Sequence, residues 1–333
     1  NQGTLEINNS LFDYCSVTQE GNETAYGGAV CNNSDGTTSI NNSTFDNCYV
    51  EQSSLYDCGG GGVYNSGSLS ISNSLIFSCS VISWSEIGNY DLFGAAVYNN
   101  NGSINIFNST LYYNGLTASV TSGSASLQGG AIYAVDDDKI CDCTLYKNYI
   151  WSLQNKDNNL GGAIYSSYES SGQNGPQIKN NIFDENYVWD NNINDYITED
   201  LYNHFFSHGY NIITGSTDRA SSGDNPDFSN DNTNATSAEV DLQTLADNGG
   251  PTQTLAITQT SVAWNAGSAT DIDGNTITTD QRGEAIYGVN DIGAYEVAGS
   301  PDQRVVPILP TWAMVLFVVL LVVLSSAWIL RRS

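Results

Sequence analysis

Acidic side chains dominate the residues that could carry chemistry in this chain of 333 residues. The sequence has 36 Asp and Glu but only 9 Lys and Arg, which gives a net charge of −27 at pH 7. This balance argues against a nucleic-acid partner, because neutralising phosphates requires Lys and Arg. The negative charge has two alternative explanations: a solvated acidic surface, or a set of divalent-cation sites.

One acidic segment has the spacing of a cation loop. Asp271, Asp273 and Asn275 place oxygen ligands at alternate positions, and Asp280 follows. The segment partly resembles a Ca²⁺ loop, but Gly274 stands at its fourth place rather than its sixth. A hairpin turn built on Asp-Gly or Gly-Asn is the alternative. Ca²⁺ is the only cofactor that the sequence suggests.

The cysteines do not form a recognisable metal site. Cys141 and Cys143 are too close in sequence for the usual zinc pairing, and His204 and His208 are the only histidines. We expect most of the 7 cysteines to be free, buried thiols. If Cys15 and Cys48 stack, they lie within bridging distance, so one disulfide is possible in an oxidising compartment.

A repeated phrase organises the elements that must position these residues. Gly-Gly-Ala-Ile-Tyr at 129–133 recurs in variant form at 27–31, 60–64, 94–98 and 161–165, with spacings of 32 to 35 residues. A second column consists of Ile7, Ile40, Ile71, Ile106, Ile140 and Ile178. The residues of a third column are large and apolar. Three residues after each of them comes Cys15, Cys48, Cys79, Asn114, Asn148 or Asn186.

These columns predict a solenoid built from strands. A fixed period of this length is typical of repeat architectures, and polar and apolar residues alternate within each copy, as in Ser103–Phe107. We therefore predict an all-β parallel β-helix of about six coils over residues 1–190, with three strands per coil. Buried Asn side chains should bond to their neighbours above and below, with Cys taking that place in the first three copies.

Each copy also carries a variable segment before the next glycine pair. These segments leave the same corner, so we expect them to protrude from one face. Trp84, Tyr90, Phe93 and Trp151 lie in them. Exposed aromatic side chains could bind glycans or proteins, or they could pack over the solenoid as a second layer.

The repeats resemble those of bacterial surface β-helices, including polymorphic outer-membrane proteins. The shared signature is Gly-Gly-Ala-Ile followed by Phe-x-x-Asn, which residues 183–186 match fully and residues 45–48 and 145–148 match with one substitution. The resemblance implies a secreted, right-handed β-helix, a scaffold common among adhesins. The chain begins in the middle of a coil, so we expect that the N-terminus is truncated and that a secretory signal lies upstream.

The segment at 241–298 resembles the choice-of-anchor Q domain. The resemblance rests on residues 245–254, on Asp-Gln-Arg-Gly at 280–283 and on Asp-Ile-Gly-Ala-Tyr-Glu at 291–296. Residues 261–267 depart from the family's Ser-Pro-Ala-Ile-Asp-Ala-Gly, which suggests a divergent member. We expect a β-rich cap that closes the open end of the solenoid, reached through an irregular extension at 191–240.

The C-terminal residues predict membrane attachment. A linker at 299–311 precedes an apolar segment at 312–330 that is long enough to span a bilayer, and residues 331–333 form a basic tail expected in the cytoplasm. The arrangement resembles the IPTL-CTERM sorting signal, carried here by Pro307, Pro310, Thr311, Trp312, Arg331 and Arg332. The resemblance implies export, handling by an exosortase-type protease, and an N-terminal part outside the cell.

Catalysis is not expected from the basic residues. Parallel β-helices include polysaccharide lyases, which need a Lys or Arg base beside acidic cation ligands, and hydrolases, which need paired carboxylates. No acidic column matches Lys147 or Lys179, and Asp136–Asp138 has the composition of a turn. We therefore predict a non-catalytic surface protein, adhesin-like or structural in a biofilm or matrix, whose partners could include glycans or proteins of host or neighbouring surfaces. A polysaccharide-degrading enzyme and a spacer for a missing N-terminal domain are the alternatives.

Overall fold

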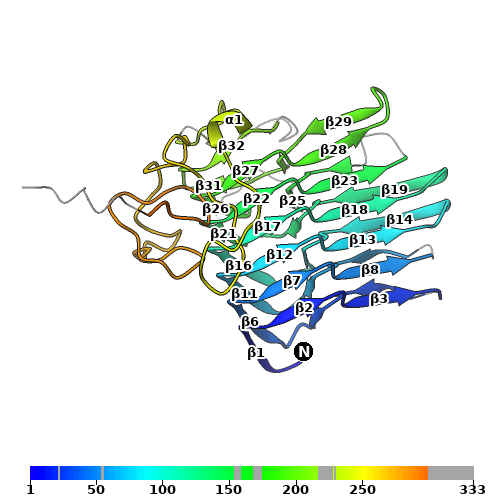
Figure 1. The fold of residues 1–333 in the computed structure, drawn as a ribbon. Helices are drawn as coiled ribbons and strands as arrows, with labels where there is room; N and C mark the ends of the chain where they lie inside the picture. Colours follow the sequence, from blue (N-terminus) through cyan, green and yellow to red (C-terminus); the bar gives the residue numbers. More distant parts are fainter. Residues whose placement is uncertain are drawn as a thin grey trace, which may run out of the picture. The chain divides into compact units, whose positions relative to one another are not determined.

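The protein is a stack of parallel strands. The computed structural model describes residues 1–298, apart from 22, 54–55, 154–158, 168–174, 217–227 and 229. Residues 1–297 form one compact unit. Within the described residues the strands make five sheets, and every pair is parallel except the last pair of one sheet. The prediction of an all-β parallel solenoid of about six turns is confirmed (Figure 1).

Three sheets surround the main core and correspond to the three predicted columns. The isoleucine sheet contains β1 (Thr4–Asn8), β6 (Thr37–Asn41), β11 (Ser68–Ser72), β16 (Ser103–Phe107), β21 (Lys139–Cys141), β26 (Gln177–Lys179) and β31 (Phe206–Ser207). The phenylalanine sheet contains β2 (Leu11–Asp13), β7 (Thr44–Asp46), β12 (Leu75–Phe77), β17 (Thr110–Tyr112), β22 (Thr144–Tyr146), β27 (Ile182–Asp184) and β32 (Ile212–Ile213). The tyrosine sheet contains β5 (Val30–Asn32), β10 (Val63–Asn65), β15 (Val97–Asn99), β20 (Ile132–Ala134), β25 (Ile164–Ser166) and β30 (Leu201–Tyr202).

Two further sheets were not predicted. The first arm sheet contains β3 (Ser16–Gln19), β8 (Tyr49–Gln52), β13 (Ser80–Ser83), β18 (Gly115–Ala118), β23 (Tyr149–Ser152), β28 (Tyr187–Asp190) and β29 (Asp195–Thr198). The second arm sheet contains β4 (Ala25–Tyr26), β9 (Cys58–Gly59), β14 (Ile87–Phe93), β19 (Ser122–Gln128) and β24 (Asn159–Leu160). Together we call them the arm, which projects from one side of the stack in Figure 1.

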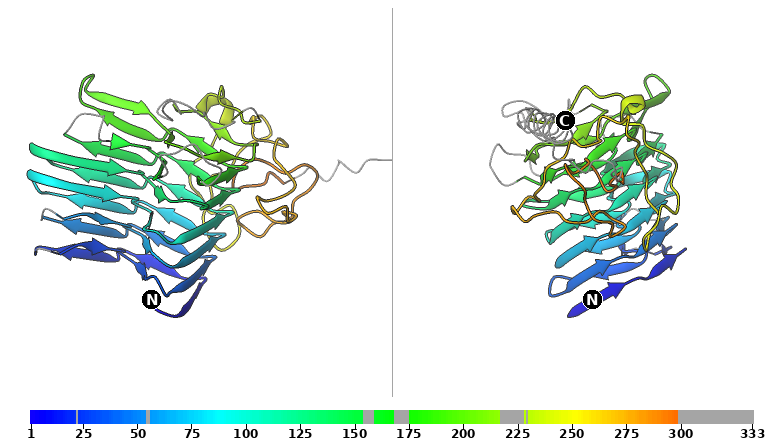
Figure 2. Two further views of the ribbon diagram at one scale, coloured as in Figure 1. Left: turned by 180° about the vertical axis from the view of Figure 1, so that it is seen from behind. Right: turned by 60° about the vertical axis from the view of Figure 1, so that its left-hand side comes forward.

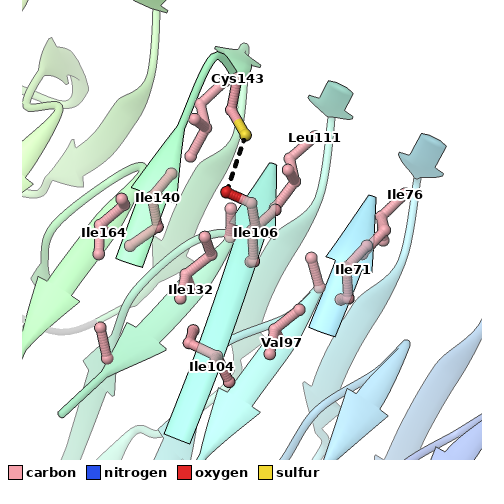
Figure 3. Close-up of a cluster of buried hydrophobic side chains, with 14 of the residues drawn as sticks. Ile71, Ile76, Val97, Ile104, Ile106, Leu111, Ile132, Ile140, Cys143 and Ile164 are labelled. Carbon is pink, nitrogen blue, oxygen red and sulfur yellow. Dashed lines mark hydrogen bonds between the residues drawn. The ribbon is translucent and has the colours of Figure 1, made fainter. Parts of the chain in front are cut away.

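Alternation along each strand places one set of side chains in the main core. In β16, Ile104 and Ile106 are buried while Ser103 and Asn105 are exposed, as period two requires. Figure 3 shows Ile71, Ile106 and Ile140 following one another up the stack. Between the isoleucine and phenylalanine sheets the chain turns through left-handed residues with φ of 47° to 59°, namely Asn9, Asn42, Asn73, Asn108, Asp142 and Asn180. Asn and Asp tolerate this conformation better than other non-glycine residues.

The variable segments project from one side as expected, but they are paired strands with a core of their own, so the expectation of three strands per coil is wrong. Val50, Val81, Leu92, Leu116, Leu127 and Ile150 are buried between the two sheets of the arm. Tyr90 is also buried, and its hydroxyl donates to the Ser85 carbonyl at 3.1 Å. Phe93 stacks on Tyr98 with 4.7 Å between ring centroids. These two aromatics therefore form a second layer, whereas Trp84 remains 53% exposed.

The segment at 191–240 is more regular than expected. Strands β30, β31 and β32 add a further rung to the three main sheets, and β29 pairs antiparallel with β28. A short helix, α1 (Ser237–Val240), follows. Because β29 occupies the edge of β28, it blocks further parallel pairing at that end of the arm.

Residues 241–297, which we call the C-terminal flank, differ from the predicted cap in structure and position. Their described pairings are isolated bridges, including Thr270 with Thr276, and turns replace the expected strands. The flank runs along the side of the stack rather than over its end (Figures 1 and 2). Asn73, Asn108 and Asn180, from three different coils, all hydrogen-bond to it. Its sequence has no strand periodicity, and it bonds instead to polar groups of the left-handed Asn corners.

The C-terminal predictions fall outside the described residues. These are the linker at 299–311, the membrane segment at 312–330 and the tail at 331–333. In the part of the chain that the structure describes, no helix has the length and apolar character needed to cross a membrane.

Candidate functional site

A groove of about 220 Å³ lies where the C-terminal flank meets the outer face of the isoleucine sheet. Its floor comes from outward positions of β11, β16 and β21, because alternate residues of each strand face away from the core. Ser70, Asn105 and Lys139 are in register on one row. Ser72, Phe107 and Cys141 form the next row. Asp271, Ile272 and Asp273 of the flank form the wall.

The wall is a hairpin turn, which is the alternative that the sequence left open. The Asn275 amide N–H donates to Asp271 Oδ1 at 2.8 Å, and the Asn275 side chain donates to Asp271 Oδ2 at 2.9 Å. Gly274 adopts a φ of 84°, which favours glycine. Both carboxylate oxygens of Asp271 therefore bond within the turn.

The four residues predicted to bind Ca²⁺ separate into three environments. Asp271 and Asn275 bond to each other, Asp273 pairs with Lys139, and Asp280 accepts from Arg282 at 2.6 Å. Among the described residues, no group of three or more His, Cys, Asp or Glu side chains is placed to hold a metal ion. Calcium binding at this loop stays a prediction.

Two lysines reach the groove and its upper end. Lys139 of β21 pairs with Asp273 in a partly exposed contact. Lys179 of β26 is only 9% exposed, and its Nζ donates to Thr270 Oγ1 at 3.2 Å and to the Asp271 carbonyl at 3.0 Å. Both cations therefore help to hold the flank against the sheet. The sequence did not reveal these contacts because Asp273 lies 134 residues from Lys139, and Thr270 and Asp271 lie 91 and 92 residues from Lys179.

Other titratable groups surround this region. His208 Nε2 lies 3.0 Å from Gln177 Oε1, and burial together with Lys179 and Lys139 lowers the pKa of His208. Asp142 accepts from the Cys141 thiol at 3.0 Å and from Asn180 Nδ2 at 2.8 Å. Burial raises the pKa of Asp142 to about 7, although Lys179 opposes the rise.

The remaining basic residues lie elsewhere. Lys147 pairs with Glu185 at 3.3 Å and sits 4.6 Å from the Tyr146 ring centroid, beside the phenylalanine sheet. Lys156 and Arg219 fall outside the described residues. Among the described residues, Lys139 is the lysine that lines the groove. Its outward row could be derived from the repeat columns, but the opposing wall could not.

The predicted Asn column forms a chain of hydrogen bonds between side-chain amides at the corner between the phenylalanine sheet and the first arm sheet. Asn114 donates to Asn148 and Asn148 donates to Asn186, each at 2.9 Å. The last amide, that of Asn186, donates to Asp200 at 2.7 Å. Below them, all three cysteines of the column, Cys15, Cys48 and Cys79, carry free thiols. The six isoleucines of the second column all point into the main core, where Ile7 is the most exposed, at 7%.

A second Asn ladder was missed. Asn32 donates to Asn65 at 2.7 Å, Asn65 donates to Asn99 at 2.8 Å, and Asn99 donates to both oxygens of Asp138. The signal was present in the repeated phrase, because Asn follows two residues after Val30, Val63 and Val97. It is interrupted in later copies, where Ala134 and Ser166 take the place.

The residues that resemble the choice-of-anchor Q domain form a buried framework inside the flank. Arg282 donates to Asp280 and to the Glu296 carbonyl, and its guanidinium lies 3.9 Å from the Tyr295 ring centroid. Glu296 accepts from the Asp291 N–H at 2.9 Å. In this chain these motif residues hold the flank together rather than line the groove.

The sorting-signal residues lie outside the described residues, as does the rest of the chain beyond 298. No protein-family model, curated protein or solved structure matches the chain. The resemblances to surface β-helices, to the choice-of-anchor Q domain and to the IPTL-CTERM signal stay predictions.

Proposed function

We propose that this chain is an exported, non-catalytic, right-handed β-helix protein that binds glycans at its surface in an adhesin-like role. The observation that carries the proposal is the groove and the polar face that leads into it. Glu6, Ser39, Ser70 and Asn105 are exposed, in-register neighbours on the outer face of the isoleucine sheet. Thr4, Thr37, Ser68 and Ser103 form a parallel exposed row.

This surface has the chemistry that a sugar chain requires. Hydroxyl and amide side chains both donate and accept hydrogen bonds, so they can match the hydroxyls of a sugar. The half-buried Phe107 ring offers an apolar face within the same groove. Concave sites that combine apolar contacts with a few polar groups are typical of small-ligand binding. The C-terminal sorting signal and its exosortase-type partner belong to the same proposal and account for how the protein would reach the surface.

The test is glycan-array binding by the full chain and by variants of the groove. Phe107→Ala and Asn105→Ala should each reduce binding at least tenfold. Trp84→Ala is the matched control, because Trp84 is an exposed aromatic on the arm, away from the groove. Loss of binding with Trp84→Ala alone would move the glycan site to the arm. Absence of binding to any glycan would favour the structural spacer.

A polysaccharide-degrading enzyme is the second candidate, and one observation favours it. Lys139, Asp271 and Asp273 line one groove on a single sheet face, and lyases combine a base with acidic groups in this way. The full chain should be incubated with acidic polysaccharides, with and without Ca²⁺. Product is followed by the absorbance of unsaturated uronides and by new reducing ends. Activity that Lys139→Ala removes and Lys147→Ala retains would establish the enzyme and overturn the non-catalytic proposal.

A further inference from the structure

Three thiols are stacked in register at the corner between the phenylalanine sheet and the first arm sheet. Cys15, Cys48 and Cys79 follow strands in which Phe12 pairs with Phe45 and Phe45 pairs with Ile76. The Phe12 and Phe45 rings stack at 4.7 Å between centroids, which shows how closely the coils follow each other here. Cys48 lies between the other two, because β7 lies between β2 and β12 in the sheet.

The spacing suits a disulfide between adjacent coils. In-register neighbours on parallel strands lie about 4.8 Å apart, and bridged cysteines have Cα separations of about 4.4–6.8 Å. Cys48 Sγ already lies 3.5 Å from the Phe12 carbonyl oxygen of the preceding coil. Cys15 lies between β2 and β3, which among the described strands pair with β7 and β8.

Access to the three thiols differs. Cys15 is half-buried, whereas Cys48 and Cys79 are fully buried. A disulfide reagent from solution therefore meets Cys15 first. The other cysteines are placed differently: Cys31 is exposed on the tyrosine sheet, Cys58 lies in the arm core, and Cys141 borders the groove while Cys143 is in the main core.

We propose that Cys15, Cys48 and Cys79 form a disulfide relay that carries oxidation from the surface into the solenoid. In the first step the Cys15 thiolate attacks a low-molecular-weight disulfide such as oxidised glutathione, which releases one glutathione thiolate. The Cys48 thiolate then attacks Cys15 Sγ and expels the second glutathione, so the Cys15–Cys48 disulfide forms. Finally the Cys79 thiolate attacks Cys48 Sγ, forming Cys48–Cys79 and returning Cys15 to a thiol.

Each step is a thiol–disulfide exchange, so glutathione disulfide supplies the only net oxidation and every proton released is taken up by the leaving thiolate or by water. The relay ends with a buried disulfide that external thiols reach less readily than Cys15. It also joins the second and third coils covalently while leaving the first coil free. This inference is independent of glycan binding.

The experiment follows disulfide formation in the full chain in a glutathione redox buffer. Samples are quenched with acid, free thiols are alkylated, and non-reduced digests are mapped by mass spectrometry over time. Glutathione on Cys15 should appear first, the Cys15–Cys48 link next and the Cys48–Cys79 link last. In Cys79→Ala the Cys15–Cys48 link should accumulate, and in Cys15→Ala oxidation of Cys48 should slow at least tenfold.

Cys31→Ala is the matched control and should leave all three steps unchanged, because Cys31 is exposed on another sheet. Circular dichroism of each variant shows whether the sheets are retained. The proposal is overturned if no link forms within the column in the folded wild-type chain. It is also overturned if Cys15–Cys48 forms but never transfers, or if Cys48–Cys79 forms equally fast without Cys15.

Discussion

Each buried asparagine ladder has a direction, because the amide Nδ2 of one coil donates to the Oδ1 of the next. The final amide therefore needs an acceptor that requires no onward partner. A third, shorter ladder joins Asn181 to Asn211, with the Asn181 amide donating at 3.0 Å. Asp138, Asp200 and Asp231 accept from the last amides of the three ladders, those of Asn99, Asn186 and Asn211. A carboxylate suits this place because it accepts without needing to donate. The acidic residues at these positions are thus explained by the ladders.

Interrupting a ladder should destabilise the whole stack. Asn148→Ala removes the acceptor of the Asn114 side chain and the donor to Asn186 and to the Leu111 carbonyl. Unsatisfied buried groups cost about 1–3 kcal/mol each, so we expect a loss of about 3 kcal/mol in the free energy of unfolding. Urea unfolding followed by circular dichroism measures it.

The exposed Asn105 on β16 gives the control. Asn105→Ala should change the free energy of unfolding by less than about 0.5 kcal/mol. Equal effects of the two substitutions would mean that the ladder contributes no more than a surface amide.

Asp142 should make stability depend on pH. Its pKa is about 7 in the folded protein, above the ordinary value of 3.8, because the carboxyl is buried. The folded state therefore holds the proton more tightly than the unfolded state. The resulting stability is fully present below about pH 4 and is lost as pH rises to about 7.

Asparagine should remove this loss, since Asn already occupies the equivalent left-handed corner in the neighbouring coils at Asn108 and Asn180. An amide at 142 could accept from Asn180 and donate to the Cys141 sulfur. We expect Asp142→Asn to stabilise the protein by about 2 kcal/mol at pH 8 and by little at pH 4. Urea unfolding at both pH values is the measurement. The exposed Asp137→Asn should show no such difference, and an equal gain at both pH values would contradict the argument.

At the scale of elements, the arm and the main core have separate apolar cores. The arm's interior contains Leu92 and Leu127, which are fully buried between its two sheets. The main core contains Ile106 and Ile140 (Figure 3). Separate cores allow one element to open while the other stays folded.

Leu127→Ala should loosen the arm first. Loss of a buried leucine side chain costs about 2–5 kcal/mol through transfer and cavity terms. We expect faster hydrogen exchange in β14, β19 and β24, with the isoleucine sheet unchanged. Exchange monitored by mass spectrometry shows the pattern, and Ile140→Ala is the control that should accelerate exchange in all three main sheets. Uniform acceleration by Leu127→Ala would mean that the arm and the stack unfold together.

Sequence columns predicted the sheets that repeat in register and missed the elements that do not. Isoleucine, phenylalanine and glycine-pair positions recur with little variation, so the three main sheets followed from them. The first strand of each arm segment also has a recurring apolar position, occupied for example by Val50 and Val81. Its partner in the second arm sheet varies in length, from 2 residues in β9 to 7 in β14. The flank could not be placed because its contacts, such as Asn108 with Thr279, join residues 171 positions apart. The groove was hard to predict for the same reason, because its floor is made of repeated strand positions whereas its wall belongs to the flank.

At the scale of the whole molecule, the flank connects coils that otherwise contact only their neighbours. Hydrogen bonds join it to Asn73, Thr110, Thr144 and Asn180, which belong to successive coils. Stacked repeats are stabilised mainly by nearest-neighbour contacts. A side connection of this kind couples distant coils and completes the groove at the same time.

Removal of Arg282 tests whether the flank is an independent element. Its side chain is 7% exposed and pairs with Asp280, which is 4% exposed. Loss of one partner of a buried ion pair costs about 3–5 kcal/mol, because the remaining charge stays uncompensated. In Arg282→Ala we expect proteases to cut within 241–297 while the strand signal in circular dichroism persists, because the sheets bond among themselves.

Cleavage sites mapped by mass spectrometry give the result, and the exposed Glu284→Ala should resist proteolysis as the wild type does. If the flank loses its structure in Arg282→Ala, glycan binding should also fall, because Asp271 and Asp273 of the flank form the groove wall. An intact flank, or loss of the sheets together with it, would contradict its role as a separately folded side element. Retained binding after flank cleavage would instead assign the ligand to the polar face of the isoleucine sheet alone.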